Sequence, residues 1–119
     1  MPMQKILVVE DEPLLRMAAV DMFEEEGFEV IEARDAIEAI EILEQRTDIS
    51  VVFTDVDMPR GMDGMKLAAI VRDRWPPLHI IITSGHMTPS EESLPAGSKF
   101  FSKPYREHEV IGEIRRMPT

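Results

Sequence analysis

The chain has 119 residues, of which 44% are hydrophobic, so it can form one domain with one core and is too apolar to be disordered throughout. A formal net charge of −10 disfavours nucleic acid and anionic membranes as direct partners, because both require Lys and Arg on the binding face. The chain has no cysteine, which excludes disulfides and thiolate metal sites and agrees with a reducing cytoplasm. No apolar run approaches the roughly 20 residues that cross a bilayer. We therefore expect a cytoplasmic protein.

Short apolar runs alternate along the chain with segments of helical period, which predicts β-strands separated by helices. The first, third and fourth runs are rich in Val and Ile and apolar throughout, as is typical of central strands in a parallel sheet. The second run is more mixed and suits an edge strand. The five expected strands are Lys5–Val9, Glu29–Ala33, Ile49–Thr54, His79–Thr83 and Lys99–Ser102.

Four segments place apolar residues at helical spacing. A first helix begins at Pro13, whose missing N–H is harmless there, and Gly27 ends it. Asp35 is the expected N-cap of the second helix, and the prolines at 76 and 77 stop the third. The second, third and last helices are expected over Ala36–Arg46, Gly64–Trp75 and Arg106–Met117.

The segment Met87–Gly97 should hold a further helix between the last two strands. It contains two prolines and few apolar anchors, so we expect this fourth helix to be short or irregular. The alternation of strands and helices fills residues 1–119. The sequence therefore predicts a single α/β domain with a doubly wound five-stranded parallel sheet, flanked by about five helices.

Acidic residues follow two of the strands. Glu10 and Asp11 come after the first, and Asp55 and Asp57 after the third. The carboxyl ends of parallel strands meet at one edge of the sheet, so these carboxylates should lie close together. Two such charges about 5 Å apart repel by roughly 3 kcal/mol at an effective dielectric of about 20. A hard divalent cation would compensate that repulsion; the alternative is that each acid only ends a strand or begins a helix.

Four segments, each at the end of an expected strand, together resemble the receiver domain of bacterial two-component response regulators. The resemblance covers essentially the whole chain. It implies a flavodoxin-like fold with strand order 2-1-3-4-5 and an active edge at the carboxyl ends of the strands. The segments are Lys5–Glu12, Asp55–Pro59 with Met62–Gly64 after it, Ile82–Gly85, and Phe100–Tyr105.

The resemblance assigns Asp55 as the residue that accepts a phosphoryl group from a histidine kinase or histidine phosphotransfer protein. It implies that Asp11, Asp55 and the backbone carbonyl of Asp57 bind Mg²⁺ or Mn²⁺, and that Glu10 acts mostly through metal-bound water. Such a domain is a phosphoacceptor in signalling. It is not an enzyme in the usual sense, because it catalyses only its own phosphorylation and slow dephosphorylation.

Further roles follow from the same resemblance. Lys103 supplies a cation to one phosphoryl oxygen, and its peptide bond to Pro104 is expected to be cis. Thr83 assists at the site and forms a switch with Phe100: the hydroxyl moves toward the phosphoryl group and the ring turns inward. The implied output surface lies within residues 88–117 and would contact an output protein or a second copy of the chain.

The sequence departs from the family's common pattern at several positions. Glu10 replaces the commoner Asp, Phe100 replaces the commoner Tyr, and Asp57 adds a charge near the site. An extra residue lengthens the loop after Asp57, where Gly61 is expected to take positive φ. Gly85 leaves its flank of the site open to water, so we expect a short-lived phosphoryl group.

Two other functions fit part of the pattern. Asp55 and Asp57 match the aspartate pair of haloacid-dehalogenase-like phosphatases, but that family places its nucleophile on the first strand and a second acidic pair near the end. A receiver relative that no longer takes phosphate is the second alternative. The retention of Asp11, Thr83 and Lys103 beside Asp55 argues against it.

Overall fold

Five parallel strands form one sheet in the order β2-β1-β3-β4-β5, which confirms the predicted fold class and strand order. The computed structural model describes residues 4–58, 62–86 and 88–117. The strands are β1 (Lys5–Val9), β2 (Glu29–Ala33), β3 (Val51–Asp55), β4 (His79–Ser84) and β5 (Ser98–Ser102).

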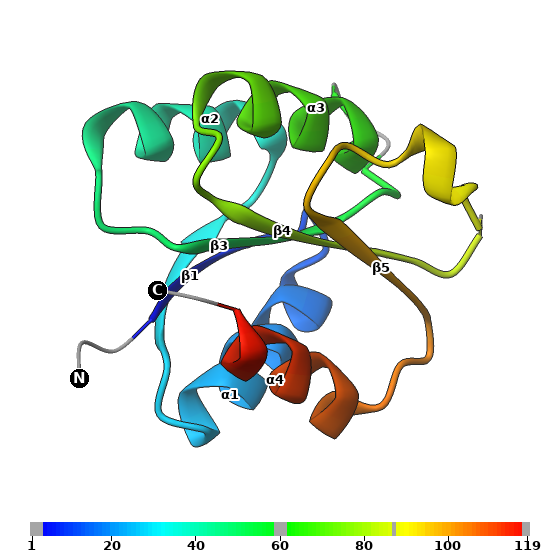
Figure 1. The fold of residues 1–119 in the computed structure, drawn as a ribbon. Coiled ribbons are helices and arrows are strands. Elements are labelled where there is room, and N and C mark those ends of the chain that lie inside the picture. The colour runs from blue at the N-terminus through cyan, green and yellow to red at the C-terminus, as the bar shows by residue number, and fades with distance from the viewer. Residues whose placement is uncertain (1–3, 59–61, 87, 118–119) are drawn as a thin grey trace.

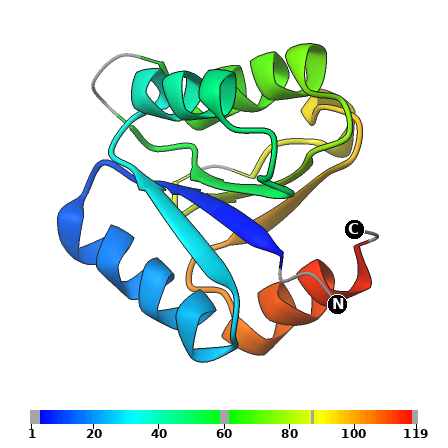
Figure 2. The ribbon, with the colours of Figure 1, turned by 90° about the vertical axis from the view of Figure 1, so that its left-hand side faces the viewer.

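Helices cover both faces of the sheet. Figure 1 shows α2 and α3 above the sheet and α1 and α4 below it, and the turned view of Figure 2 shows the same layers. The predicted caps are present: the carboxylate of Asp35 accepts a hydrogen bond from the Glu38 N–H at 2.8 Å, and Gly27 has φ +92°. The helices are α1 (Pro13–Glu25), α2 (Ala36–Gln45), α3 (Gly64–Arg74) and α4 (Glu107–Arg116).

The crossover between β4 and β5 holds only a 3₁₀ turn, η1 (Glu91–Ser93), where a fourth helix was expected to be short or irregular. Gly97 ends this crossover with φ +79°, and a Cβ there would collide with the guanidinium of Arg72. That guanidinium donates to the Leu78 carbonyl at 2.9 Å. The end of α3 therefore lies directly against the end of the crossover.

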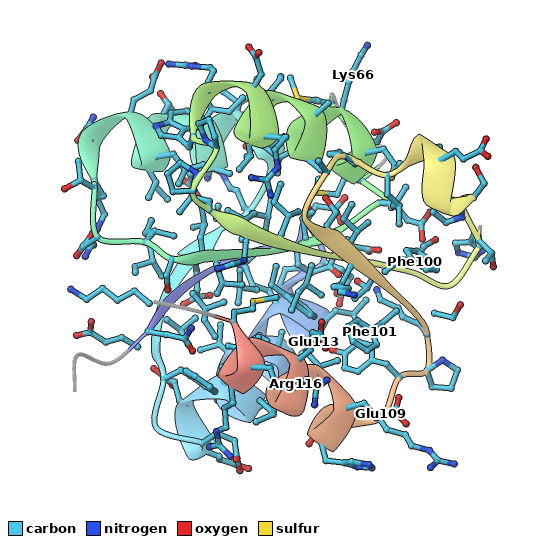
Figure 3. The ribbon with its side chains drawn as sticks, viewed as in Figure 1. Lys66, Phe100, Phe101, Glu109, Glu113 and Arg116 are labelled. Carbon is cyan, nitrogen blue, oxygen red and sulfur yellow. The ribbon has the colours of Figure 1, made fainter. Side chains whose placement is uncertain are left out.

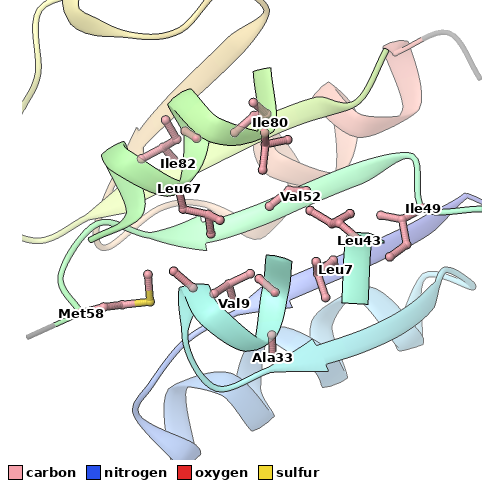
Figure 4. Packing of buried hydrophobic residues seen from close by; sticks show 14 of the residues in the cluster. Leu7, Val9, Ala33, Leu43, Ile49, Val52, Met58, Leu67, Ile80 and Ile82 are labelled. Carbon is pink, nitrogen blue, oxygen red and sulfur yellow. The ribbon is translucent and has the colours of Figure 1, made fainter. Parts of the chain in front are cut away.

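The core consists of two clusters, one on each face of the sheet, because successive side chains of a strand point to opposite faces. Figure 4 shows the cluster under α2 and α3, in which Leu7, Val52 and Ile80 of neighbouring strands are fully buried. The opposite cluster lies under α1 and α4, and its largest fully buried side chain is Phe23. Packing in these clusters holds β1 and β3 in place, and with them the strand ends that carry the acidic residues.

Four strand boundaries differ from the sequence prediction: β3 begins at Val51 and not at Ile49, β5 begins at Ser98 and not at Lys99, and β3 and β4 each end one residue later. β3 runs from Val51 through Asp55, because Asp55 still pairs with Thr83, and β4 extends to Ser84, which pairs with Ser102. The expected nucleophile is therefore the last residue of a strand. The expectation for Gly61 concerns a residue outside the described ranges. Among the described residues, the helices are too short or too polar to cross a membrane.

Candidate functional site

Buried carboxylates lie at the carboxyl ends of two neighbouring inner strands, β1 and β3. Glu10 is 6% exposed and Asp55 is 4% exposed. Glu10 continues the strand pairing beyond β1, since its N–H donates to the Ala33 carbonyl at 3.1 Å. Both side chains line a cavity of about 1050 Å³, together with Asp11 and Asp57. The predicted grouping of the four acidic residues at one sheet edge is therefore present.

Lys103 brings a positive charge into this group from the loop after β5. Its ammonium nitrogen lies 3.1 Å from Asp55 Oδ2 and 3.6 Å from Glu10 Oε1. The Lys103 N–H donates to the Ser84 carbonyl at 2.9 Å, which holds the loop against the end of β4. The Lys103–Pro104 peptide bond is cis, as predicted.

The pKa of Glu10 is raised to about 7. Burial of its carboxylate is the main cause, and the nearby negative charge of Asp55 acts in the same direction. The Glu12 N–H, which donates to Glu10 Oε2 at 3.1 Å, opposes the shift, and so does Lys103. The Glu10 carboxyl group therefore holds its proton more tightly than an exposed glutamate does, even with Lys103 beside it.

Arg16 on α1 holds the backbone of the segment that carries Glu10 and Asp11. One of its terminal nitrogens, Nη1, donates to the Glu10 carbonyl at 2.8 Å, and its Nε lies 3.3 Å from Glu32 Oε1 on β2. The first turn of α1 is thereby fixed to the loop that carries Glu10 and Asp11. The sequence interpretation missed this contact, because spacing along the chain does not show which carbonyl a long side chain will reach.

The loop after β3 is held in two ways. The Asp57 N–H donates to Asp55 Oδ1 at 3.3 Å, and Asp57 Oδ2 accepts a hydrogen bond from the Ser84 hydroxyl at 2.9 Å. On the other side, Gly64 begins α3 directly against the backbone of Asp55, so that a Cβ at Gly64 would overlap the Asp55 carbonyl and lie 2.9 Å from the Cα of Val56. The main chain around Asp55 is therefore confined by both β4 and α3.

Thr83 and Phe100 lie on opposite faces of the sheet. Thr83 is 1% exposed and pairs in register with Phe101, whereas Phe100 pairs with Ile82. Phe101 packs with the cluster under α1 and α4, and Phe100 packs with the cluster under α2 and α3 (Figure 3). Thr83 lines a second cavity, of about 460 Å³, on the α1 side. The switch role of Thr83 and Phe100 stays a prediction.

The side chains at the carboxyl edge offer oxygen donors, which suit a hard cation such as Mg²⁺. Within residues 4–58, 62–86 and 88–117, no three His, Cys, Asp or Glu side chains are arranged to hold a metal ion by themselves. This does not conflict with the expected ligands, which are the carboxylates of Asp11 and Asp55, the backbone carbonyl of Asp57 and water. Mg²⁺ usually keeps several waters, which would complete its coordination beside these ligands.

The family model of the response regulator receiver domain matches residues 6–115. The chain belongs to this family, the receiver domains of two-component response regulators. Receiver domains act in signalling and are not enzymes of the usual kind.

Individual proteins agree with this assignment. The response regulator receiver protein CpdR of Brucella abortus is 31% identical, and the match covers 97% of both chains. The sensor kinase CckA of the same organism is 34% identical over 94% of this chain, which corresponds to only 12% of CckA. The response regulator protein TrrA of Thermotoga maritima, solved in complex with Mg²⁺-BeF, superimposes with a TM-score of 0.87 at 26% identity, covering 98% of this chain and all of that one.

Proposed function

We propose that residues 1–119 act as one receiver domain that accepts a phosphoryl group on Asp55 in a Mg²⁺-dependent reaction. The observation that carries the proposal is the pairing of a buried Asp55 carboxylate with Lys103 at 3.1 Å, inside a cavity rimmed by further carboxylates. A buried aspartate held beside a fixed cation is suited to attack a phosphorus atom and to have the charge of its product neutralised.

The carboxylates of Asp11 and Asp55 and the backbone carbonyl of Asp57 would hold Mg²⁺ or Mn²⁺, and Glu10 would act through metal-bound water. When bound, the metal supplies positive charge to the oxygens of the transferred phosphoryl group. The relative TrrA was solved in complex with Mg²⁺-BeF, which supports a Mg²⁺ site in this chain.

The chain's own residues supply the remaining steps. Asp55 is the nucleophile: one of its carboxylate oxygens forms a bond to phosphorus while the bond from phosphorus to the donor's histidine nitrogen breaks and the imidazole leaves. Its Oδ1 is oriented by the Asp57 N–H, and its Oδ2 faces Lys103. The ammonium of Lys103 exchanges its contact with Asp55 for one with a phosphoryl oxygen. The Thr83 hydroxyl, at the neighbouring position of the sheet, donates to another of these oxygens.

The donor would be a histidine kinase or a histidine phosphotransfer protein. Leu14 is 72% exposed and Ile37 is 57% exposed, and they lie in the first turns of α1 and α2, at the carboxyl edge of the sheet. We infer that the donor docks over these exposed apolar side chains. The output surface would lie within residues 88–117, for an output protein or a second copy of the chain, in the cytoplasm.

Intact mass after incubation with Mg²⁺ and acetyl phosphate tests the proposal. We expect one added phosphoryl group, which is lost in the presence of a chelator and in Asp55→Asn. An adduct that persists in Asp55→Asn would place the phosphoryl group elsewhere. Neither an adduct nor Mg²⁺ binding would support a phosphate-independent interaction module, and multiple turnover of a phosphomonoester would support a phosphatase.

A further inference from the structure

The side chain of Ser84 joins the end of β4 to the loop after β3. Ser84 is 1% exposed, and its hydroxyl donates to Asp57 Oδ2 at 2.9 Å. The Ser84 hydroxyl oxygen in turn accepts a hydrogen bond from the His86 N–H at 3.1 Å. A hydroxyl has one proton to donate, so the hydrogen bond from His86 leaves that proton directed at the carboxylate of Asp57.

The backbone of Ser84 contacts the loop after β5, which carries Lys103. Its carbonyl accepts the Lys103 N–H at 2.9 Å. One buried residue therefore contacts both the loop that holds Asp57 and the loop that holds Lys103. Val56, which precedes Asp57, also links the loop after β3 to β4, because its N–H donates to the Thr83 carbonyl at 2.8 Å.

The contact with Asp57 has a consequence for the metal ligands. With its carboxylate bound by Ser84 and its N–H bound to Asp55 Oδ1, Asp57 is held at both its side chain and its main chain. Its backbone carbonyl, the expected ligand, is thereby positioned in advance. A ligand that is already ordered does not have to lose conformational freedom when the metal binds.

We propose that Ser84 is a positioning residue for the metal-binding loop, and that it acts through the carboxylate of Asp57. This inference rests on the proposed function, because it concerns the affinity of that site for Mg²⁺. The contact would also couple the expected movement of Thr83 to the metal-binding loop. Ser84 follows Thr83 directly, so a displacement of Thr83 toward a phosphoryl group would alter the hydrogen bond that orders Asp57.

The test is the dissociation constant for Mg²⁺, measured by following backbone amide shifts in the full chain. Removal of a hydrogen bond to a charged group should weaken Mg²⁺ binding about fivefold in Ser84→Ala. The matched control is Ser50→Ala, because the Ser50 hydroxyl donates to the Lys5 carbonyl at the opposite end of the sheet. Ser50→Ala should leave the dissociation constant unchanged.

A double-mutant cycle separates positioning from a general loss of structure. If Ser84 acts through Asp57, Ser84→Ala should weaken Mg²⁺ binding in the unaltered chain but not in an Asp57→Ala background. An equal effect in both backgrounds would overturn the inference. Should Ser84→Ala fail to fold, Asp57→Ala alone tests the same hydrogen bond from its other end, and an unchanged dissociation constant there would also overturn it.

The result distinguishes this inference from the proposed function. Mg²⁺ binding that Asp11→Asn removes and Ser84→Ala leaves unchanged would overturn the role of Ser84 alone. An unaltered chain that does not bind Mg²⁺ would overturn both.

Discussion

The ammonium of Lys103 reaches Asp55 across an intervening strand. Lys103 follows β5, Asp55 ends β3, and β4 lies between them, yet their charged atoms are 3.1 Å apart. The Lys103 side chain can cross the end of β4 only if the side chains there are small. The residues at this position are Thr83, Ser84 and Gly85. The small side chains at this strand end therefore allow the cation and the nucleophile to meet.

The raised pKa of Glu10 predicts a pH-dependent stability of the metal-free protein. A carboxylate whose pKa is about 7 in the folded state and 4.5 when unfolded binds its proton more tightly in the fold. Stability is therefore greatest below pH 4.5 with respect to this group and is lost as the pH rises toward 7. The loss should be roughly 2–3 kcal/mol.

Urea unfolding between pH 5 and 8, with a chelator present, measures this loss. Glu10→Gln should flatten the profile, and Mg²⁺ should restore stability at the higher pH values. A stability that rises over this range in the unaltered chain and not in Glu10→Gln would contradict the assigned direction of the shift.

Gly64→Ala should damage the site through the backbone of Asp55. The added Cβ would overlap the Asp55 carbonyl and lie 2.9 Å from the Cα of Val56, and neither atom can move without shifting β3. We expect a loss of roughly 1–3 kcal/mol in the free energy of unfolding, and slower phosphorylation by acetyl phosphate.

The matched control is Gly112→Ala in α4. There the nearest atom to an added Cβ is the flexible Arg116 Nη1 at 3.6 Å. Replacing a helical glycine by alanine should stabilise the protein by about 0.5–1 kcal/mol. Equal effects of the two substitutions would show that the approach of Gly64 to Asp55 is unimportant.

Gly85→Arg should lengthen the lifetime of the phosphorylated protein. Gly85 is exposed beside the cavity, and a Cβ there would lie 3.7 Å from the Lys103 Cβ, an ordinary contact. A long side chain at this position can therefore be accommodated and would cover the flank that is now open to water. Intact mass at intervals after removal of the donor gives the half-life.

Gly85→Ala provides the control for Gly85→Arg, since a methyl group adds no cover. It should leave the half-life close to that of the unaltered chain. If Gly85→Arg also decayed at the original rate, water would reach the phosphoryl group by another path.

Thr83→Ala should still be phosphorylated but should show a smaller conformational response. Without the hydroxyl, the phosphoryl group loses the donor that would draw the end of β4 toward it. The response can be measured as the change in backbone amide shifts of β5 and α4 on addition of Mg²⁺ and acetyl phosphate. An undiminished change would show that Thr83 is not the switch.

The aromatic partner of Thr83 is tested in the same experiment. We expect Phe100→Leu to reduce the response. A reduction in Phe101→Leu instead would identify the ring that shares a face with Thr83 as the partner.

The sequence predicted the strands well, because their apolar runs are clear and their order follows from the family resemblance. It also predicted which acidic residues meet, since Glu10 and Asp55 end adjacent strands. It could not predict that Asp55 lies within β3, because that depends on how far β4 continues the pairing.

Side-chain contacts between distant segments could not be predicted. The hydrogen bond from Ser84 to Asp57 spans 27 positions in the chain, and its geometry depends on the exact ends of two strands. The sequence also could not predict toward which face of the sheet Phe100 and Phe101 each point, because two consecutive aromatic residues fit a strand in either register.

The strands at the centre and at the β5 edge of the sheet differ in burial. All five residues of β3 are buried, whereas none of β5 is, and β5 is hydrogen-bonded to one neighbour only. An edge strand with few buried side chains opens at a lower free-energy cost than the centre of the sheet. Amide hydrogen exchange should therefore be faster in β5 than in β3, so the strand that carries Phe100 should also need less energy to rearrange than the centre of the sheet.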